Sequence, residues 1–249
     1  MFDPPVAIAS LSGQSDAQWA LAVEEYIGAA VLGGLAIDDR SREAARAMVE
    51  RGRDEFLPSD PIAFMDAQLS ALDSASIQPG FNVRSTTLEP IRRAAACCAR
   101  HDAIIEINAH CRQEELCAVG CGETLLADTD RLCDSVGAAV TAEAPVSVKV
   151  RTEVPGVDLA ETARRVAAAG ADMIHVDAMD SEPMVATVVE AAPELTVIAN
   201  NGVRDAHSVR EYLDYGADAV SVGRPSDDPR VLRRVRRAAV DWFAPESKV

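Results

Sequence analysis

Short apolar runs alternate with longer amphipathic stretches along the whole chain. The runs are rich in valine, isoleucine and alanine, and each interval between them leaves room for one helix. This pattern is typical of parallel α/β proteins, whose strands are largely buried and are connected by helical crossovers. We expect strands at 5–10, 28–34, 77–83, 103–108, 145–151, 172–177, 195–200 and 218–222.

The stretches between the runs carry signals for the start and the end of helices. Two examples each begin with an aspartate as the N-cap and are followed by a glycine in the position that ends a helix. They are residues 158–169 (DLAETARRVAAA) with Gly170, and residues 205–215 with Gly216. A helix is therefore expected after each strand.

Eight strands that are each followed by a helix favour a closed (β/α)8 TIM barrel over an open doubly wound sheet. The 249 residues suffice for one such barrel, so we expect a single α/β domain over 1–249. The longest connection, about 36–76, contains two helical patterns and is predicted to be an elaborated second unit. After the last strand, the sequence predicts one helix at about 228–242.

The net charge and the cysteine content limit the kinds of ligand and the cellular compartment that we expect for this protein. The net charge of -16 would repel a polyanion unless positive charge gathers in one place. All basic residues but Lys149 and Lys248 are arginines, and we hypothesise a halophilic protein that works in concentrated, screening salt. The sequence shows no membrane span, no signal peptide and no CxxC pair, so we expect a cytoplasmic protein with free thiols and no metal site.

Two cationic side chains stand near the end of one predicted strand, where the active site of a barrel lies. In the segment PVSVKVR, Lys149 and Arg151 are two residues apart and share one face of the strand. If that face is the barrel interior, their burial requires anionic or electron-rich partners. A functional role is favoured, and an ion pair with a carboxylate of a neighbouring strand is the alternative.

Two glycine turns follow the last two predicted strands. They are VIANNGV at 197–203 and VSVGRP at 220–225. Glycine lets backbone N–H groups approach an anion, and many barrels bind phosphate after strands seven and eight. We predict a phosphate site here, and two ordinary strand-to-helix turns are the alternative.

The order and spacing of several segments resemble the dihydrouridine synthase family of FMN-binding barrels and, more distantly, the dihydroorotate dehydrogenases. EINAHCRQEELCAVGCGETLL at 106–126 aligns with the family's D-I-N-x-G-C-P and G-x-G-x-x-L-L segments, and KVR at 149–151 aligns with its K-x-R. SLSG at 10–13 stands where the family has P-M-A-G, and GFN at 80–82 stands where the family has a strand that ends in glutamine. IANNG and VGR match the two turns of the family that bind phosphate. The resemblance covers about 5–242 and is to a short, archaeal-type member without the helical domain that grips tRNA.

This resemblance implies a site. Cys111 would be the general acid that protonates a pyrimidine carbon while flavin N5 exchanges hydride, and Lys149 would stabilise the anionic reduced flavin. Asn108 and Arg151 would bind the substrate. The implied FMN contacts are Ser10, Leu11, Ser12, Asn82, Lys149, Asp177, Asn200, Asn201, Gly202, Gly223 and Arg224. The predicted function is an FMN oxidoreductase acting on a pyrimidine-like C=C bond, resembling uridine reduction to 5,6-dihydrouridine in tRNA, with NAD(P)H as candidate reductant.

Some residues depart from the family pattern. Asp177 replaces the histidine of the family's H-G-R segment and adds a negative charge, and His175 is a candidate substitute because it faces the same side. The glycine, proline and two lysines around and after the family's cysteine are here His110, Arg112, Glu114 and Glu115.

Several alternatives stay open. The substrate is tRNA or a small pyrimidine-like molecule, as in a dihydroorotate or dihydropyrimidine dehydrogenase-like flavoenzyme. Another class is a phosphate-binding barrel without redox function. The arginine-rich stretch 230–240 is either an RNA-binding patch or a solvated outer helix, and a homo-oligomer is a candidate assembly. A zinc ion or an iron–sulfur cluster bound by His110, Cys111, Cys117 and Cys121 is disfavoured, because their spacing suits no common knuckle.

Overall fold

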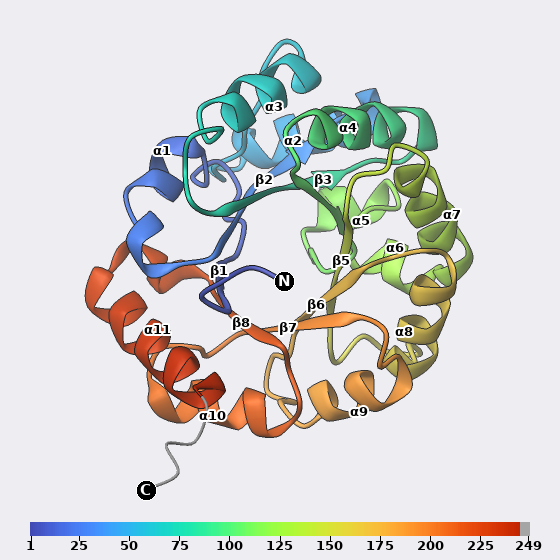
Figure 1. Cartoon of the computed structure of the whole chain (residues 1–249). Helices are drawn as coiled ribbons and strands as arrows, with labels where there is room; N and C mark the ends of the chain where they lie inside the picture. Colours follow the sequence, from blue (N-terminus) through green and yellow to red (C-terminus); the bar gives the residue numbers. More distant parts are fainter. Residues whose placement is uncertain (245–249) are drawn as a thin grey trace, which may run out of the picture.

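The structure, a computed structural model, describes residues 1–244. Its eight parallel strands are hydrogen-bonded in sequence order, and β8 closes onto β1 to complete the barrel (Figure 1). The predicted (β/α)8 TIM barrel is confirmed. The strands are β1 (Val6–Ile8), β2 (Ala29–Ala36), β3 (Gln78–Arg84), β4 (Ile104–Asn108), β5 (Val146–Arg151), β6 (Met173–Asp177), β7 (Thr196–Asn200) and β8 (Ala219–Val222).

Helices cover the outside of the barrel (Figure 1). They are α1 (Ala17–Leu21), α2 (Asp39–Glu50), α3 (Pro61–Ser70), α4 (Leu88–Arg100), α5 (Glu114–Ala118), α6 (Glu123–Ala127), α7 (Thr129–Val140), α8 (Leu159–Ala168), α9 (Met184–Ala191), α10 (Ala206–Asp214) and α11 (Pro229–Phe243). Two 3-10 helices, Glu24–Tyr26 and Arg224–Asp227, follow α1 and β8. None of the helices within residues 1–244 has the length and apolar character needed to cross a membrane.

The expected helix boundaries are present in the second half of the barrel. The side chain of Asp158 accepts a hydrogen bond from the backbone of α8, and Asp205 does the same for α10. Gly170 and Gly216 follow these helices with φ of +101° and +90°, a region that favours glycine. The long connection between β2 and β3 contains the two expected helices, α2 and α3.

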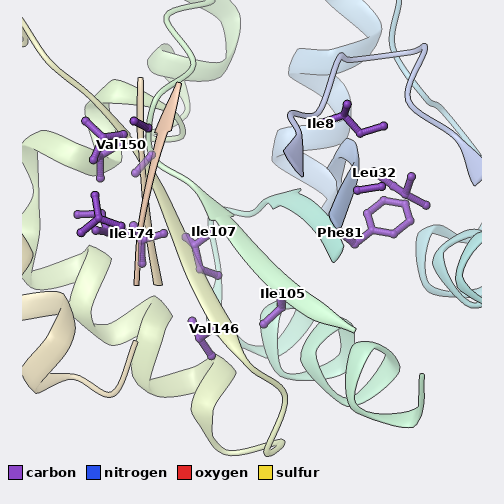
Figure 2. Packing of buried hydrophobic residues seen from close by; sticks show 14 of the residues in the cluster. Ile8, Leu32, Phe81, Ile105, Ile107, Val146, Val150 and Ile174 are labelled. Atoms are coloured by element: carbon purple, nitrogen blue, oxygen red, sulfur yellow. The ribbon is translucent and has the colours of Figure 1, made fainter. Parts of the chain in front are cut away.

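Apolar side chains on the outer face of the strands pack against the helices. Figure 2 shows Ile105 and Ile107 of β4 near Val146 of β5, and Val150 of β5 near Ile174 of β6. These residues alternate along each strand with the side chains that point into the barrel. The hydrophobic core therefore lies between the strands and the helices.

The barrel interior is polar around Glu106 of β4. In the register of the sheet, Glu106 is paired with Asn82 of β3 and with Ser147 of β5. Its fully buried carboxylate accepts hydrogen bonds from Asn82 Nδ2 at 2.7 Å and Ser147 Oγ at 3.3 Å, and contacts His175 Nδ1 at 2.7 Å. One carboxylate thus connects four neighbouring strands.

The network continues from His175 toward the last strands of the barrel. His175 Nε2 lies 2.7 Å from Ser221 Oγ, and Asn200 Nδ2 donates to the same hydroxyl at 2.7 Å. These contacts suit a neutral imidazole that donates from Nδ1 to Glu106 and accepts at Nε2 from Ser221. The interior hydrogen bonds therefore run from β3 to β8.

The surroundings inside the barrel also shift the pKa values of the ionisable side chains there. Burial by itself raises the pKa of Glu106, but its close contact with His175, the positive charge of Lys149 and the hydrogen bond from Asn82 outweigh burial and lower the pKa to about 2. Burial lowers the pKa of Lys149, and the negative charges of Glu106 and Asp177 oppose this effect. Glu106 is therefore the anion that offsets the buried cation of Lys149.

We predict that Glu106→Gln destabilises the barrel and weakens its response to acid. At neutral pH the free energy of unfolding should fall by about 3–5 kcal/mol, because Lys149 loses its buried counter-charge. The folded-state pKa of Glu106 lies below its ordinary value of 4.5, so its stabilisation is present above pH 4.5 and is lost as the pH falls toward 2. Urea unfolding at pH 7 and pH 3 should thus show a smaller pH dependence in the variant.

Glu161→Gln is the control for this experiment, because Glu161 forms an exposed ion pair with Arg164 and belongs to the helix surface. It should change the free energy of unfolding by less than about 1 kcal/mol. An equal loss of stability between pH 7 and pH 3 in Glu106→Gln and in the unsubstituted protein would contradict the assignment.

Candidate active site

A cavity of about 780 Å³ opens at the C-terminal ends of the strands. This volume is in the range of small-molecule and cofactor sites. The cavity is lined by every site residue expected from the sequence except Asn82: Ser10, Leu11, Ser12, Asn108, Cys111, Lys149, Arg151, Asp177, Asn200, Asn201, Gly202, Gly223 and Arg224. Residues from β1 to β8 and their following loops thus meet in one place.

Asn82 is not among the residues that line this cavity. Its side chain is fully buried, donates to Glu106 and accepts a 2.8 Å hydrogen bond from Asn108 Nδ2. The structure therefore places Asn82 in the interior network, where it supports Asn108, and its flavin contact stays a prediction.

The loop that carries Cys111 is held from two sides. Asn108 Oδ1 accepts a hydrogen bond from the backbone N–H of Cys111 at 3.2 Å. On the other side, the Cys111 carbonyl accepts from Glu123 N at 2.8 Å and lies so close to Gly122 that an added Cβ would be 1.9 Å from it. Gly122 also has φ of +60°, so this close approach requires glycine. The half-buried Cys111 side chain is thereby fixed at the cavity wall.

The neighbouring cysteines pack and do not join Cys111 in a ligand set. Cys121 lies in an apolar cluster with Met48 and Leu116, and Cys117 Sγ contacts the Cys111 carbonyl at 3.5 Å. Burial, with added repulsion from Lys149, lowers the pKa of the nearby His110 well below its ordinary value. Within residues 1–244, these side chains do not form a cluster of three ligand atoms close enough to share an ion.

The two cations of β5 differ in their partners. Lys149 is almost fully buried, and its strand neighbours in register are Asn108 and His175. Arg151 forms an ion pair with Glu123 at 3.3 Å. The alternative predicted from the sequence, an ion pair, therefore holds for Arg151, but its partner comes from α6 and not from a neighbouring strand.

A second buried ion pair lies at the cavity and was not expected from the sequence. Arg84, at the end of β3, contacts Glu55 at 2.7 Å and donates to Ser12 Oγ. Both charged side chains are almost fully buried. A signal for Arg84 is present in the sequence, because Arg84 stands two residues after Asn82 and therefore shares its interior face. Lys149 and Arg151 were indicated by the same spacing. Glu55 lies in the irregular segment after α2, where no such signal exists.

Both glycine turns that the sequence predicts to bind phosphate leave space beside their glycines. An added Cβ at Gly202 or at Gly223 would meet no atom within 4 Å, and Gly202 has φ of +66°. Tyr212 Oη donates to the carbonyl oxygens of Asn201 at 2.9 Å and of Asn200 at 3.3 Å, which fixes the first turn from below. The backbone at both turns is therefore open to a group in the cavity.

Asp177 faces the same cavity and is bound to the first turn. Its carboxylate accepts a 3.0 Å hydrogen bond from Asn201 Nδ2, and Lys149 lies near enough for the two charges to attract. His175, the candidate substitute for the family histidine, is fully buried, and its two ring nitrogens contact Glu106 and Ser221. It is not among the residues that line the cavity.

Positive charge gathers around the opening of the cavity. Four exposed arginines line it, and we call them the mouth arginines: Arg53, Arg112, Arg204 and Arg224. Close by, Arg51 forms a 2.8 Å ion pair with Glu115, one of the glutamates that replace family lysines. Exposed arginines are thus gathered at the opening of the cavity, in a chain whose net charge is -16.

Comparison with known proteins places the chain in a family. The family model described as "Dihydrouridine synthase (Dus)" matches residues 73–249, more than two thirds of the chain. A protein named "Probable tRNA-dihydrouridine synthase" from Rhodobacter capsulatus is 30% identical over 239 residues, which cover 89% of this chain and 67% of that protein. An uncharacterized protein of Methanocaldococcus jannaschii, MJ0144, is 26% identical and covers 97% of this chain and 93% of its own length.

Solved structures with little sequence identity share the barrel. A mandelate oxidase variant superposes with a TM-score of 0.58 at 18% identity, over 94% of this chain and 73% of that one. Tryptophan synthase from Pyrococcus furiosus superposes with a TM-score of 0.58 at 13% identity, over 96% and 98% of the two chains. These similarities show the fold alone. The family model and the Rhodobacter relative go further, and the chain belongs to the dihydrouridine synthase family of oxidoreductases.

Proposed function

We propose that the cavity binds FMN and that the protein reduces uridine in tRNA to 5,6-dihydrouridine, with NAD(P)H as reductant. The observation that carries this proposal is the meeting of Cys111, Lys149 and both phosphate turns in one cavity of about 780 Å³. Membership of the dihydrouridine synthase family supports it.

The residues of the cavity fit FMN at both of its ends. The open backbone at Gly202 and Gly223 admits a phosphate, and Arg224 beside it would donate charge-assisted hydrogen bonds to that group. Lys149 would lie by the N1 and O2 edge of the ring, where its positive charge favours the anionic reduced form. When bound, FMN supplies the hydride that reduces the substrate carbon.

Cys111 would supply the proton that completes the reduction. Its thiol would transfer the proton from Sγ to the neighbouring ring carbon of uridine, and the resulting thiolate would be reprotonated by solvent. Asn108 and Gly122 would make this transfer effective by holding the loop of Cys111 in one position. Asn108 is thus a positioning residue for Cys111. It also lines the cavity, where its side-chain amide would contact the substrate.

The mouth arginines favour tRNA as the substrate. Arginine contacts to phosphates provide much of the affinity of proteins for nucleic acids, and here they surround the opening through which the base must enter. A small pyrimidine-like molecule is the second candidate, because the net charge of -16 opposes a polyanion elsewhere on the surface.

We predict that the purified protein binds one FMN, seen as the yellow absorption of the flavin and as a raised melting temperature. Arg224→Gln should weaken FMN binding roughly tenfold or more, because it removes a charged hydrogen-bond donor at the phosphate. Gly223→Val should weaken it as well by filling the open space beside the turn.

The matched control is Gly137→Val, at a position on α7 where an added Cβ also meets no atom within 4 Å. It should leave FMN affinity unchanged. A colourless protein that gains stability from a phosphorylated sugar but not from FMN would instead support a phosphate-binding barrel without redox function.

We predict that Cys111→Ala lowers the rate of dihydrouridine formation about 100-fold or more while FMN affinity is retained, because only the proton donor is lost. Mass spectrometry of an unmodified tRNA transcript after incubation with NADPH measures the product. Cys133→Ala, which removes a half-buried thiol of α7, should keep full activity. Equal rates in the two variants would eliminate Cys111 as the acid.

We predict that Arg53→Gln and Arg112→Gln each weaken tRNA binding and reduce the slope of log affinity against log salt by about one. Arg236→Gln, on the exposed face of the arginine-rich α11, is the control and should change neither quantity. If Arg236→Gln weakens tRNA binding and the other two substitutions do not, the RNA-binding surface lies on α11. If none of the proteins binds tRNA, the small-molecule substrate becomes the better assignment.

A further inference from the structure

Three side chains of types that can bind metal ions meet on the outside of the barrel, where α3 packs against α4 (Figure 1). Asp66 comes from α3, Cys97 from the last turn of α4, and His101 follows the end of α4. None of them lines the cavity of the candidate active site. We propose that these three residues bind a zinc ion that joins α3 to α4.

The distances between the ligand atoms suit a tetrahedral site. Zinc bonds of 2.0–2.3 Å give separations of roughly 3.3 Å between an oxygen and a nitrogen ligand and roughly 3.6 Å between a sulfur and an oxygen ligand. Asp66 Oδ1 lies 3.2 Å from His101 Nε2 and 3.8 Å from Cys97 Sγ. All three ligand atoms lie within 4.8 Å of one another.

A further carboxylate orients the histidine. His101 Nδ1 lies 3.0 Å from Asp73 Oδ1, so the other ring nitrogen, Nε2, is directed toward Asp66. Metal-binding histidines usually donate their second N–H to such a carboxylate, which fixes the ring and raises its basicity. The arrangement of Asp73 and His101 is therefore the one that a metal site needs.

The chemistry of the ligands points to zinc. A set of one thiolate, one imidazole and one carboxylate in tetrahedral geometry suits Zn²⁺ and suits Mg²⁺ or Ca²⁺ poorly. Burial raises the pKa of the Cys97 thiol to about 11, and zinc would displace this proton to solvent as the bond to sulfur forms. The half-exposed Asp66 leaves the fourth position open to water.

Arg100 is the group that zinc must displace. Its Nη2 donates to Asp66 Oδ1 at 2.6 Å, the same oxygen that faces His101 and Cys97. Arg100 is more than half exposed and can leave without opening the core. The ion and the guanidinium therefore compete for one carboxylate, and removal of Arg100 should favour the metal.

Titration of the full-length protein with Co²⁺ tests this site, because Co²⁺ bound to a thiolate absorbs in the near ultraviolet and tetrahedral Co²⁺ absorbs in the visible. We expect one equivalent to give both bands and Zn²⁺ to remove them. Cys97→Ser should abolish the thiolate band, and Asp73→Asn should weaken Zn²⁺ binding roughly tenfold or more. Arg100→Gln should tighten it severalfold.

Cys133→Ser is the matched control, since it removes a thiol that belongs to no cluster of ligand atoms within residues 1–244. It should leave both bands unchanged. Absence of the thiolate band in the unsubstituted protein, or its survival in Cys97→Ser, would overturn the proposal. If Cys97→Ser fails to fold, equal Zn²⁺ affinities of the unsubstituted protein, His101→Gln and Arg100→Gln would overturn it instead.

Discussion

The buried carboxylate of Glu106 is the contact on which the barrel and its cavity both depend. A polar interior is stable only when its charges are compensated and its hydrogen bonds are formed. Glu106 compensates the charge of Lys149, and its carboxylate accepts hydrogen bonds from side chains of β3, β5 and β6. The apolar layer between strands and helices can then close the barrel around a centre that is not itself hydrophobic.

The same network supports both ends of the cavity. On one side it passes through Asn82 and Asn108 to the backbone of Cys111, and on the other it passes through His175 and Ser221 to Asn200. The loop of the proposed acid and the proposed phosphate turn are thus held by one connected set of hydrogen bonds. Such a set fixes the distance between the two ends, which the proposed FMN, a molecule of fixed length, would require.

The recurrence of short apolar runs was sufficient to predict the eight strands, and the glycine turns indicated which edge of the barrel carries the site. The two-residue spacing in β5 indicated that Lys149 and Arg151 share one face. Glu106 and Asn108 have the same spacing in β4, but this spacing does not reveal which buried groups the Glu106 carboxylate meets. Contacts between distant segments were beyond such reasoning. Glu55 reaches Arg84 from an irregular segment, and Asp66 reaches His101 from another helix, so no local pattern records either pair.

The contrast between the acidic surface and the mouth arginines determines how a large anion meets this molecule. The net negative charge of the chain repels a large anion as a whole, and the mouth arginines attract it at the opening of the cavity. For the proposed tRNA substrate, the orientation of approach would thereby be selected before any base is recognised. Screening shortens the range of both effects, so in strong salt this guidance acts only over the last few ångströms of approach.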